Sequence, residues 1–191
     1  MNIGLYFGSF NPIHHGHLII ANHVANHTFI EQVWLVVSPQ NPLKASTGLL
    51  NEFQRLHLAR LAIAPDDSSL KVSDVEFGLP KPSYTIDTLT YLSEKYPQHQ
   101  FTVVMGSDSL ENLPKWKNHA LLLERYGILV YVRPQHPLPA LLPQQVQVVQ
   151  APLLDISATY IRQSIQQKKS IHYLVPEPVR IEIEQSGYYI K

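Results

Sequence analysis

The chain has 191 residues, and its 15 basic and 15 acidic side chains leave a formal net charge of zero at pH 7. A balanced charge argues against a protein that binds nucleic acid through a strongly basic surface. Folding can bury roughly 70% of the surface of a chain this long, so it needs neither disulfides nor a structural metal for stability. We expect one domain over residues 1–191, with a C-terminal helical part from about residue 157.

The composition also bears on the compartment. The chain contains no cysteine, which is compatible with a reducing environment. It has no apolar run near the ~20 residues of a transmembrane helix, and its N-terminus lacks the basic stretch of a signal peptide. We therefore expect a cytoplasmic protein with no membrane partner, and the sequence leaves homo-oligomer formation open.

Strand-like apolar runs alternate with helical patterns along the chain. The expected strands cover residues 3–7, 32–37, 70–72, 101–105, 127–132 and 146–149. Helical spacing of apolar residues covers 18–25, 52–64, 85–95 and 158–165, and a last helix opens at 176–178 and ends near Gly187. Apolar strands separated by helices predict an α/β fold, in which a doubly wound parallel sheet has helices on both faces, with a small C-terminal helical extension.

The junction between the first strand and the first helix carries the segment 8–17, Gly-Ser-Phe-Asn-Pro-Ile-His-His-Gly-His. Backbone N–H groups at a helix start, together with the helix dipole, favour a bound anion. Gly8 and Gly16 allow close approach of the main chain, while His14 and His17 can donate to phosphoryl oxygens. The segment therefore predicts phosphate binding.

Two other interpretations of this junction are weaker. Histidines three residues apart can bind a metal from one helix face, but no cysteine or nearby carboxylate completes a ligand set. A purely structural glycine-rich turn explains the glycines but not the two histidines beside them.

Polar, chemically suggestive residues follow several of the expected strands. They occupy the segments 8–17, 38–44, 106–108 and 155–157, together with Arg133. Ligands of open α/β sheets bind beyond the carboxyl ends of the strands. Loops are polar in any case, but this repeated placement favours one shared site.

A second helix start lies at residues 156–162, Ile-Ser-Ala-Thr-Tyr-Ile-Arg. Ser157 is a suitable N-cap. The free N–H groups there can bind phosphate oxygens, the hydroxyls of Ser157 and Thr159 can add hydrogen bonds, and Arg162 supplies a permanent charge. Taken alone, an ordinary capped helix with a solvated arginine explains this segment equally well.

Taken together, segments 8–17 and 156–162 resemble the GxFxPxHxGH and ISxTxxR motifs of the nucleotidyltransferase superfamily. More narrowly, the chain resembles the bacterial nicotinate mononucleotide adenylyltransferases over nearly its whole length. Further segments carry that likeness: 82–88, 105–108, 113–116 and 173–176.

The chain departs from this pattern at three positions. Ser9 and Asn11 stand where many relatives have Thr and Asp, and neither change removes phosphate-binding capacity. In the loop 41–44 the lysine is kept as Lys44, but Leu43 replaces a histidine, so no role of that histidine is carried over.

The resemblance implies a Rossmann-like fold and the transfer of AMP from ATP to nicotinate mononucleotide, giving nicotinate adenine dinucleotide and pyrophosphate. The acceptor phosphate attacks the α-phosphorus directly, so no protein nucleophile is needed. Mg²⁺ would be carried in with the co-substrate ATP, because magnesium usually keeps waters and phosphates as ligands. The implied partners are two small molecules, with no nucleic acid.

The resemblance also implies roles for individual residues. Charge on the phosphates would be stabilised by His14, His17, Lys44 and Arg162. ATP would be held by Gly8, Ser9, Phe10, Gly16, His17, Gly106, Asp108, Ile156, Ser157, Thr159 and Arg162. The acceptor would be held by Tyr84, Thr85, Trp116 and Arg133, with the indole stacking on the pyridine ring and N–H groups at Tyr84 and Thr85 binding the carboxylate.

Other interpretations remain beside this one. Trp116 could simply cover the core, Tyr84 could be a packed loop residue, and Asp108 could be a turn residue or cap. Related adenylyl- or cytidylyltransferases that use another phosphate acceptor are the nearest alternative activity. A non-catalytic nucleotide-binding regulator is the alternative outside enzymes, whereas an ordinary Rossmann oxidoreductase lacks support because the segment is not GxGxxG.

Overall fold

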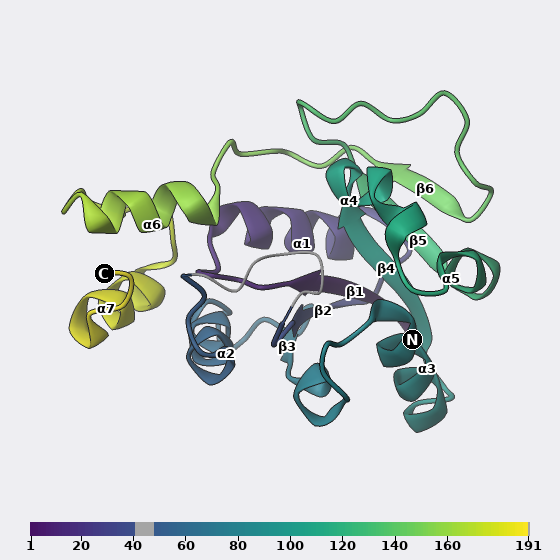
Figure 1. The fold of residues 1–191 in the computed structure, drawn as a ribbon, viewed down its shortest axis with the longest axis horizontal. Coiled ribbons are helices and arrows are strands. Elements are labelled where there is room, and N and C mark those ends of the chain that lie inside the picture. Colours follow the sequence, from purple (N-terminus) through teal and green to yellow (C-terminus); the bar gives the residue numbers. More distant parts are fainter. Residues whose placement is uncertain (41–47, 191) are drawn as a thin grey trace.

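A computed structural model describes residues 1–40 and 48–190 of the chain. Its centre is a six-stranded parallel sheet in the order β3-β2-β1-β4-β5-β6 (Figure 1). The strands are β1 (Asn2–Gly8), β2 (Gln32–Val37), β3 (Leu70–Ser73), β4 (Gln100–Gly106), β5 (Gly127–Tyr131) and β6 (Val146–Val149). Successive strands are added on one side of β1 up to β3 and on its other side from β4 onward. Doubly wound sheets bind ligands at this switch point between β1 and β4.

Helices and shorter 3₁₀ turns join the strands up to β5, whereas the connection from β5 to β6, which the structure describes throughout, contains no helix. The α-helices are α1 (His15–His27), α2 (Glu52–Leu61), α3 (Thr85–Lys95), α4 (Ser107–Glu111), α5 (His119–Arg125), α6 (Ala158–Gln166) and α7 (Glu177–Ser186). The 3₁₀ turns are η1 (Val75–Gly78) and η2 (Leu113–Lys115). The predicted doubly wound α/β fold is therefore confirmed.

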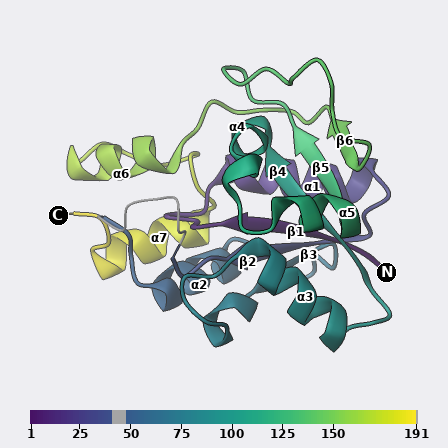
Figure 2. The same cartoon turned by 45° about the vertical axis from the view of Figure 1, so that its right-hand side comes forward.

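Side chains that alternate along the strands build two apolar layers, one on each face of the sheet. In β1, Ile3 and Leu5 face the layer shared with α3, α4 and α5, whereas Tyr6 faces the layer shared with α1, α2, α6 and α7. Figure 2 shows α1 behind the strands and α5 in front of them. Because both faces are covered, the carboxyl edge of the sheet is left to form a site.

The helices differ from the prediction in two respects. Helix α2 ends at Leu61 and not at residue 64, because Ala64 precedes Pro65 and a residue before proline avoids the helical region. Helices α4 and α5 were not predicted, since they have only five and seven residues and show too few turns for a periodic pattern. The segment 106–108 thus begins a helix and is not the loop that the sequence suggested.

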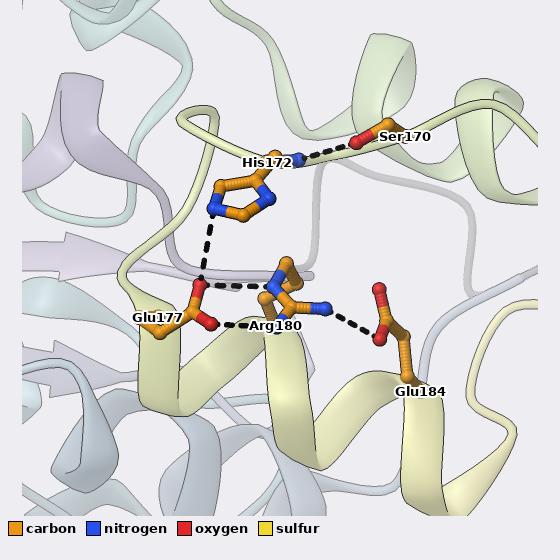
Figure 3. Close-up of polar contacts among 5 residues, drawn as sticks. All are labelled: Ser170, His172, Glu177, Arg180 and Glu184. Atoms are coloured by element: carbon orange, nitrogen blue, oxygen red, sulfur yellow. Dashed lines mark hydrogen bonds and ion pairs between the residues drawn. The ribbon is translucent and has the colours of Figure 1, made fainter.

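The C-terminal helix α7 carries a surface network of ion pairs (Figure 3). Arg180 donates to Glu177 over 2.9 Å and to Glu184 over 2.5 Å, and His172 lies 3.6 Å from Glu177. Exposed pairs of this kind contribute little to stability. Helix α7 is instead held by Val179 and Ile183, which are buried in the same apolar layer as Tyr6 of β1.

Candidate active site

A cleft of about 950 Å³ lies at the carboxyl edge of the sheet, where the ends of β1, β2, β4 and β5 meet the starts of α3 and α6. Its walls include nearly all of the residues that the sequence singled out: Gly8, Ser9, Phe10, His14, His17, Tyr84, Thr85, Gly106, Asp108, Trp116, Arg133, Ile156, Ser157, Thr159 and Arg162. Gly16 does not line the cleft and lies buried in α1. Lys44 lies outside the described residues. The polar strand ends therefore do converge.

The loop between β1 and α1 packs closely around its two histidines. Their rings are stacked, with centroids 3.7 Å apart. A Cβ atom at position 16 would lie only 3.0 Å from Nδ1 of His14. Glycine at this position therefore makes room for the His14 ring against the first turn of the helix.

The backbone fixes the orientation of the His17 ring. The N–H of His14 donates to Nδ1 of His17 over 3.3 Å, and the edges of Phe10 and Tyr6 pack around the imidazole, with centroids 5.0 and 6.2 Å away. Since Nδ1 accepts this bond, a neutral His17 carries its proton on Nε2. His17 is thus oriented to donate from Nε2.

His14 is neutral at pH 7 in the free protein. Burial, the charge of Arg133 and the charge of His15 lower its pKa to about 4. Only 4% of the residue is exposed, so an imidazolium here would lose most of its hydration. A polyphosphate in the cleft would act in the opposite direction and favour the protonated ring.

Arg162 joins the second predicted motif to the first. From α6 its Nη1 donates to the backbone carbonyl of Asn11 over 2.8 Å, and its Nη2 donates to the hydroxyl of Thr159 over 3.2 Å. The Ser157 hydroxyl accepts the N–H of Tyr160 over 3.1 Å, which confirms the predicted N-cap. The arginine is therefore bonded across the cleft and is not merely solvated.

Asn11 holds the segment that precedes α2. Its amide donates to the carbonyl of Gly48 over 3.0 Å and its side-chain oxygen accepts the N–H of Leu50 over 3.2 Å. An ionised aspartate could accept the second bond but could not donate the first. The amide thus suits this position for a local structural reason.

On the far side of the cleft, Tyr84 is the N-cap of α3 and Thr85 its first residue. Trp116 follows η2, where it both lines the cleft and packs against the apolar layer under α3 and α5. The ammonium of Lys117 lies 4.8 Å from the centroid of the Tyr84 ring and 2.7 Å from Asp87. This half of the site therefore combines a helix start with two aromatic rings and a cation.

Asp108 and Arg133 lie between the two halves, beyond β4 and β5. The Asp108 carboxylate is 3.5 Å from Nε of Arg133, and the backbone N–H of Arg133 donates to the hydroxyl of Ser107 over 2.9 Å. A Cβ atom at Gly106 would overlap the Asp108 carboxylate. Glycine is therefore required for this carboxylate to fold back against the strand end.

Arg55, which was not predicted from the sequence, is hydrogen bonded to the loops that follow β1 and β2. It is fully buried and donates to four backbone carbonyls: Ser9 (2.6 Å), Ser38 (2.8 Å), Pro39 (2.9 Å) and Leu50 (2.9 Å). Burial lowers the pKa of its guanidinium. One signal could have revealed it, because Arg55 lies on the same face of α2 as the buried Leu58 and Ala59.

Glu76, the second missed residue, is a buried carboxylate on the cleft wall. Its oxygens accept the hydroxyls of Ser83 over 2.8 Å and Thr88 over 2.9 Å. Burial raises its pKa, while hydrogen bonds from Ser83, Thr88 and Ser38 lower it. It lies in a short 3₁₀ turn, so no periodic pattern could have marked it as buried.

Within residues 1–40 and 48–190, no group of three or more His, Asp or Glu side chains is placed to hold a metal ion. The helices of that part of the chain include none that is long and apolar enough to span a membrane.

These features define a class: a doubly wound α/β protein whose cleft, at the point where the 3-2-1-4-5-6 strand order switches sides, brings two helix starts and an arginine together. A family model described as cytidylyltransferase-like matches residues 5–164. The chain therefore belongs to the cytidylyltransferase-like family.

Relatives narrow this assignment. The chain is 52% identical to a probable nicotinate-nucleotide adenylyltransferase of Cytophaga hutchinsonii, over 99% of this chain and 98% of the relative. It is 47% identical to a protein of the same description from Flavobacterium psychrophilum, over the full length of both. These relatives confirm the resemblance that the two motifs suggested.

Solved structures support the fold. Nicotinic acid mononucleotide adenylyltransferase of Plasmodium falciparum, solved in complex with NaAD, superimposes with a TM-score of 0.83 at 19% identity, covering 99% of this chain and 97% of the other. A putative nicotinate-nucleotide adenylyltransferase from Vibrio parahaemolyticus gives 0.72 at 20% identity, covering 98% and 94%.

Proposed function

We propose that the protein transfers AMP from ATP to nicotinate mononucleotide, forming nicotinate adenine dinucleotide and pyrophosphate, and that it does so as a single domain in the cytoplasm. One observation carries the proposal: a single cleft joins the histidine-bearing start of α1 and the start of α6 to an aromatic-lined helix start at α3. Full-length relatives described as probable nicotinate-nucleotide adenylyltransferases support the choice of substrates.

ATP would occupy the half of the cleft between α1 and α6. The N–H groups around Gly8 to Phe10 and at the start of α6, together with the Arg162 guanidinium and Nε2–H of His17, would bind its phosphates, and Lys44 would add a further charge. Asp108 would hold a sugar hydroxyl. His17 and Arg162 are held in place by loop contacts before any substrate arrives, and such preorganised donors lower the barrier of phosphoryl chemistry.

The acceptor would occupy the half formed by Tyr84, Thr85 and Trp116. The indole would stack on the pyridine ring, and the first N–H groups of α3 would bind the nicotinate carboxylate. Arg133, between the halves, would meet the acceptor phosphate. An oxygen of that phosphate then attacks the α-phosphorus, the bond to the β-phosphate oxygen breaks, and pyrophosphate leaves with the negative charge.

Mg²⁺ would enter the cleft bound to the phosphates of ATP, because magnesium commonly keeps phosphates and waters as its ligands. Asp108, a carboxylate in the central part of the cleft, already faces a cation, since it lies 3.5 Å from Nε of Arg133. The ion would supply positive charge on the polyphosphate.

Pyrophosphate release tests the proposal. The protein is mixed with Mg-ATP and, separately, nicotinate mononucleotide, nicotinamide mononucleotide or phosphopantetheine. We expect release mainly with nicotinate mononucleotide. No release with any acceptor would overturn the enzymatic function, and preference for the amide or for phosphopantetheine would overturn the assigned acceptor.

A further inference from the structure

Glu76 holds three segments of the cleft wall together. It lies in η1, after β3, with 2% of its surface exposed. Ser83 and Thr88, which donate to its two oxygens, lie on either side of the first turn of α3. The Ser38 hydroxyl, which also hydrogen bonds to the carboxylate, follows directly after β2.

The contacts of Glu76 are all with neutral groups. The ion pairs formed within residues 1–40 and 48–190 do not include it. A buried carboxylate without a cation is costly, and hydrogen bonds from hydroxyls offset that cost only when their geometry is fixed. Ser83 and Thr88 are themselves buried, so their hydroxyls are fixed in place around the carboxylate.

These bonds bracket the N–H groups that we propose bind the acceptor carboxylate. Tyr84 caps α3 without a side-chain hydrogen bond, so the helix start relies on its neighbours for its position. Ser83 precedes Tyr84, and Thr88 donates its backbone N–H to the Tyr84 carbonyl over 3.1 Å. A shift of Glu76 would therefore move both sides of this first turn.

We propose that Glu76 is a positioning residue for acceptor recognition. Through Ser83 and Thr88 it clamps the first turn of α3 against the loop after β2, so that Tyr84 and Thr85 meet the acid group of the acceptor. This inference rests on the proposed function, and it gives Glu76 no contact with the reacting atoms.

Steady-state kinetics of two Glu76 variants test the clamp. Glu76→Ala removes both bonds to α3, and at about 1 kcal/mol for each bond we expect the KM for nicotinate mononucleotide to rise roughly thirtyfold. The KM for ATP should stay within about twofold, because α1 and α6 keep their contacts. Glu76→Gln should restore most of the acceptor affinity, because hydroxyls can both donate to and accept from an amide.

Glu52→Ala is the matched control. It also removes one carboxylate, which pairs with Lys81 over 2.7 Å on the surface, and it leaves the Glu76 contacts intact. Its KM values should equal those of the parent. Equal rises in both KM values of Glu76→Ala, or a Gln variant as impaired as the Ala variant, would overturn the inference.

Two further measurements keep the test decisive. If Glu76→Ala does not fold, Ser83→Ala removes one of the two bonds to Glu76 and should still raise the acceptor KM about fivefold, with the KM for ATP unchanged. Hydrogen exchange needs no turnover: amides at 86–89 should exchange faster in Glu76→Ala than in Glu76→Gln. Unchanged exchange would refute the clamp, whereas an inactive parent protein with faster exchange in the Ala variant would refute the proposed function alone.

Discussion

Replacing Arg55 by leucine tests whether one buried side chain supports the loops around the cleft. Arg55 donates to four carbonyls, those of Ser9, Ser38, Pro39 and Leu50. Leucine keeps the apolar stem of the side chain but leaves these carbonyls without their donor. A buried acceptor that loses its partner costs about 1–3 kcal/mol. Ser9 and Ser38 line the cleft, so water can reach this side and reduce the cost.

Taking about 1 kcal/mol for each carbonyl, and subtracting the desolvation cost that the guanidinium no longer bears, the free energy of unfolding should fall by about 3 kcal/mol. For a chain of this length that corresponds to a Tm lowered by about 6–12 °C. Arg55→Lys should lose about half as much, because one ammonium cannot reach carbonyls on both sides of the guanidinium.

Urea unfolding followed by far-ultraviolet circular dichroism measures both variants, and pyrophosphate release gives their activity. Arg55→Leu should also raise the KM for ATP, because the Ser9 loop loses an anchor. A loss below about 1 kcal/mol, or a leucine variant with parental kinetics, would refute the anchoring role.

Three further predictions address the histidines and the indole. Gly16→Ala should maintain or slightly raise the Tm, because alanine favours a helix by about 1 kcal/mol over glycine. The new Cβ atom would lie 3.0 Å from Nδ1 of His14 and displace its ring, so kcat should fall severalfold. A kcat equal to that of the parent would contradict this packing argument. Burial, Arg133 and His15 lower the folded pKa of His14 to about 4, below the ordinary value of about 6.5, so its contribution to stability is full above pH 6.5 and is lost as the pH falls toward 4. That loss amounts to about 3 kcal/mol. The free energy of unfolding of His14→Gln, measured with urea between pH 7 and 4.5, should therefore depend less on pH than that of the parent. An identical pH dependence would show that His14 does not cause the loss of stability in acid. Trp116→Ala should weaken nicotinate mononucleotide binding about tenfold in calorimetry with ATP binding unchanged, and equal weakening of both ligands would show that the indole supports the fold as a whole.

The sequence predicted the sheet well because its four central strands, β1, β2, β4 and β5, are apolar runs buried on both faces. It also predicted which strand ends form the cleft, since parallel strands place all their carboxyl ends at one edge. It missed α4 and α5 because one or two helical turns carry no readable period. It extended α2 past Leu61 because Ala62 and Ile63 continue the apolar pattern while the chain already turns before Pro65.

The predicted cleft residues were those with a conspicuous local pattern. His14 and His17 stand beside glycines, and Ser157 and Arg162 stand at a helix start. Arg55 and Glu76 lack such a pattern, because several of their partners lie in other elements of the fold: Ser9 lies 46 residues from Arg55 and Thr88 lies 12 from Glu76. Tertiary partners of this kind can be recognised only in the folded chain.

The two buried charges meet at one residue. Arg55 donates to the carbonyl of Ser38, and the hydroxyl of Ser38 hydrogen bonds to Glu76. Ser38 directly follows β2, so it lies between the loop of the first motif, held by Arg55, and the first turn of α3, held by Glu76. The Arg55 guanidinium and the Glu76 carboxylate do not pair with each other. Each is hydrogen bonded to neutral groups and fixes the backbone around it. The two halves of the cleft are therefore set relative to each other by a buried framework of hydrogen bonds.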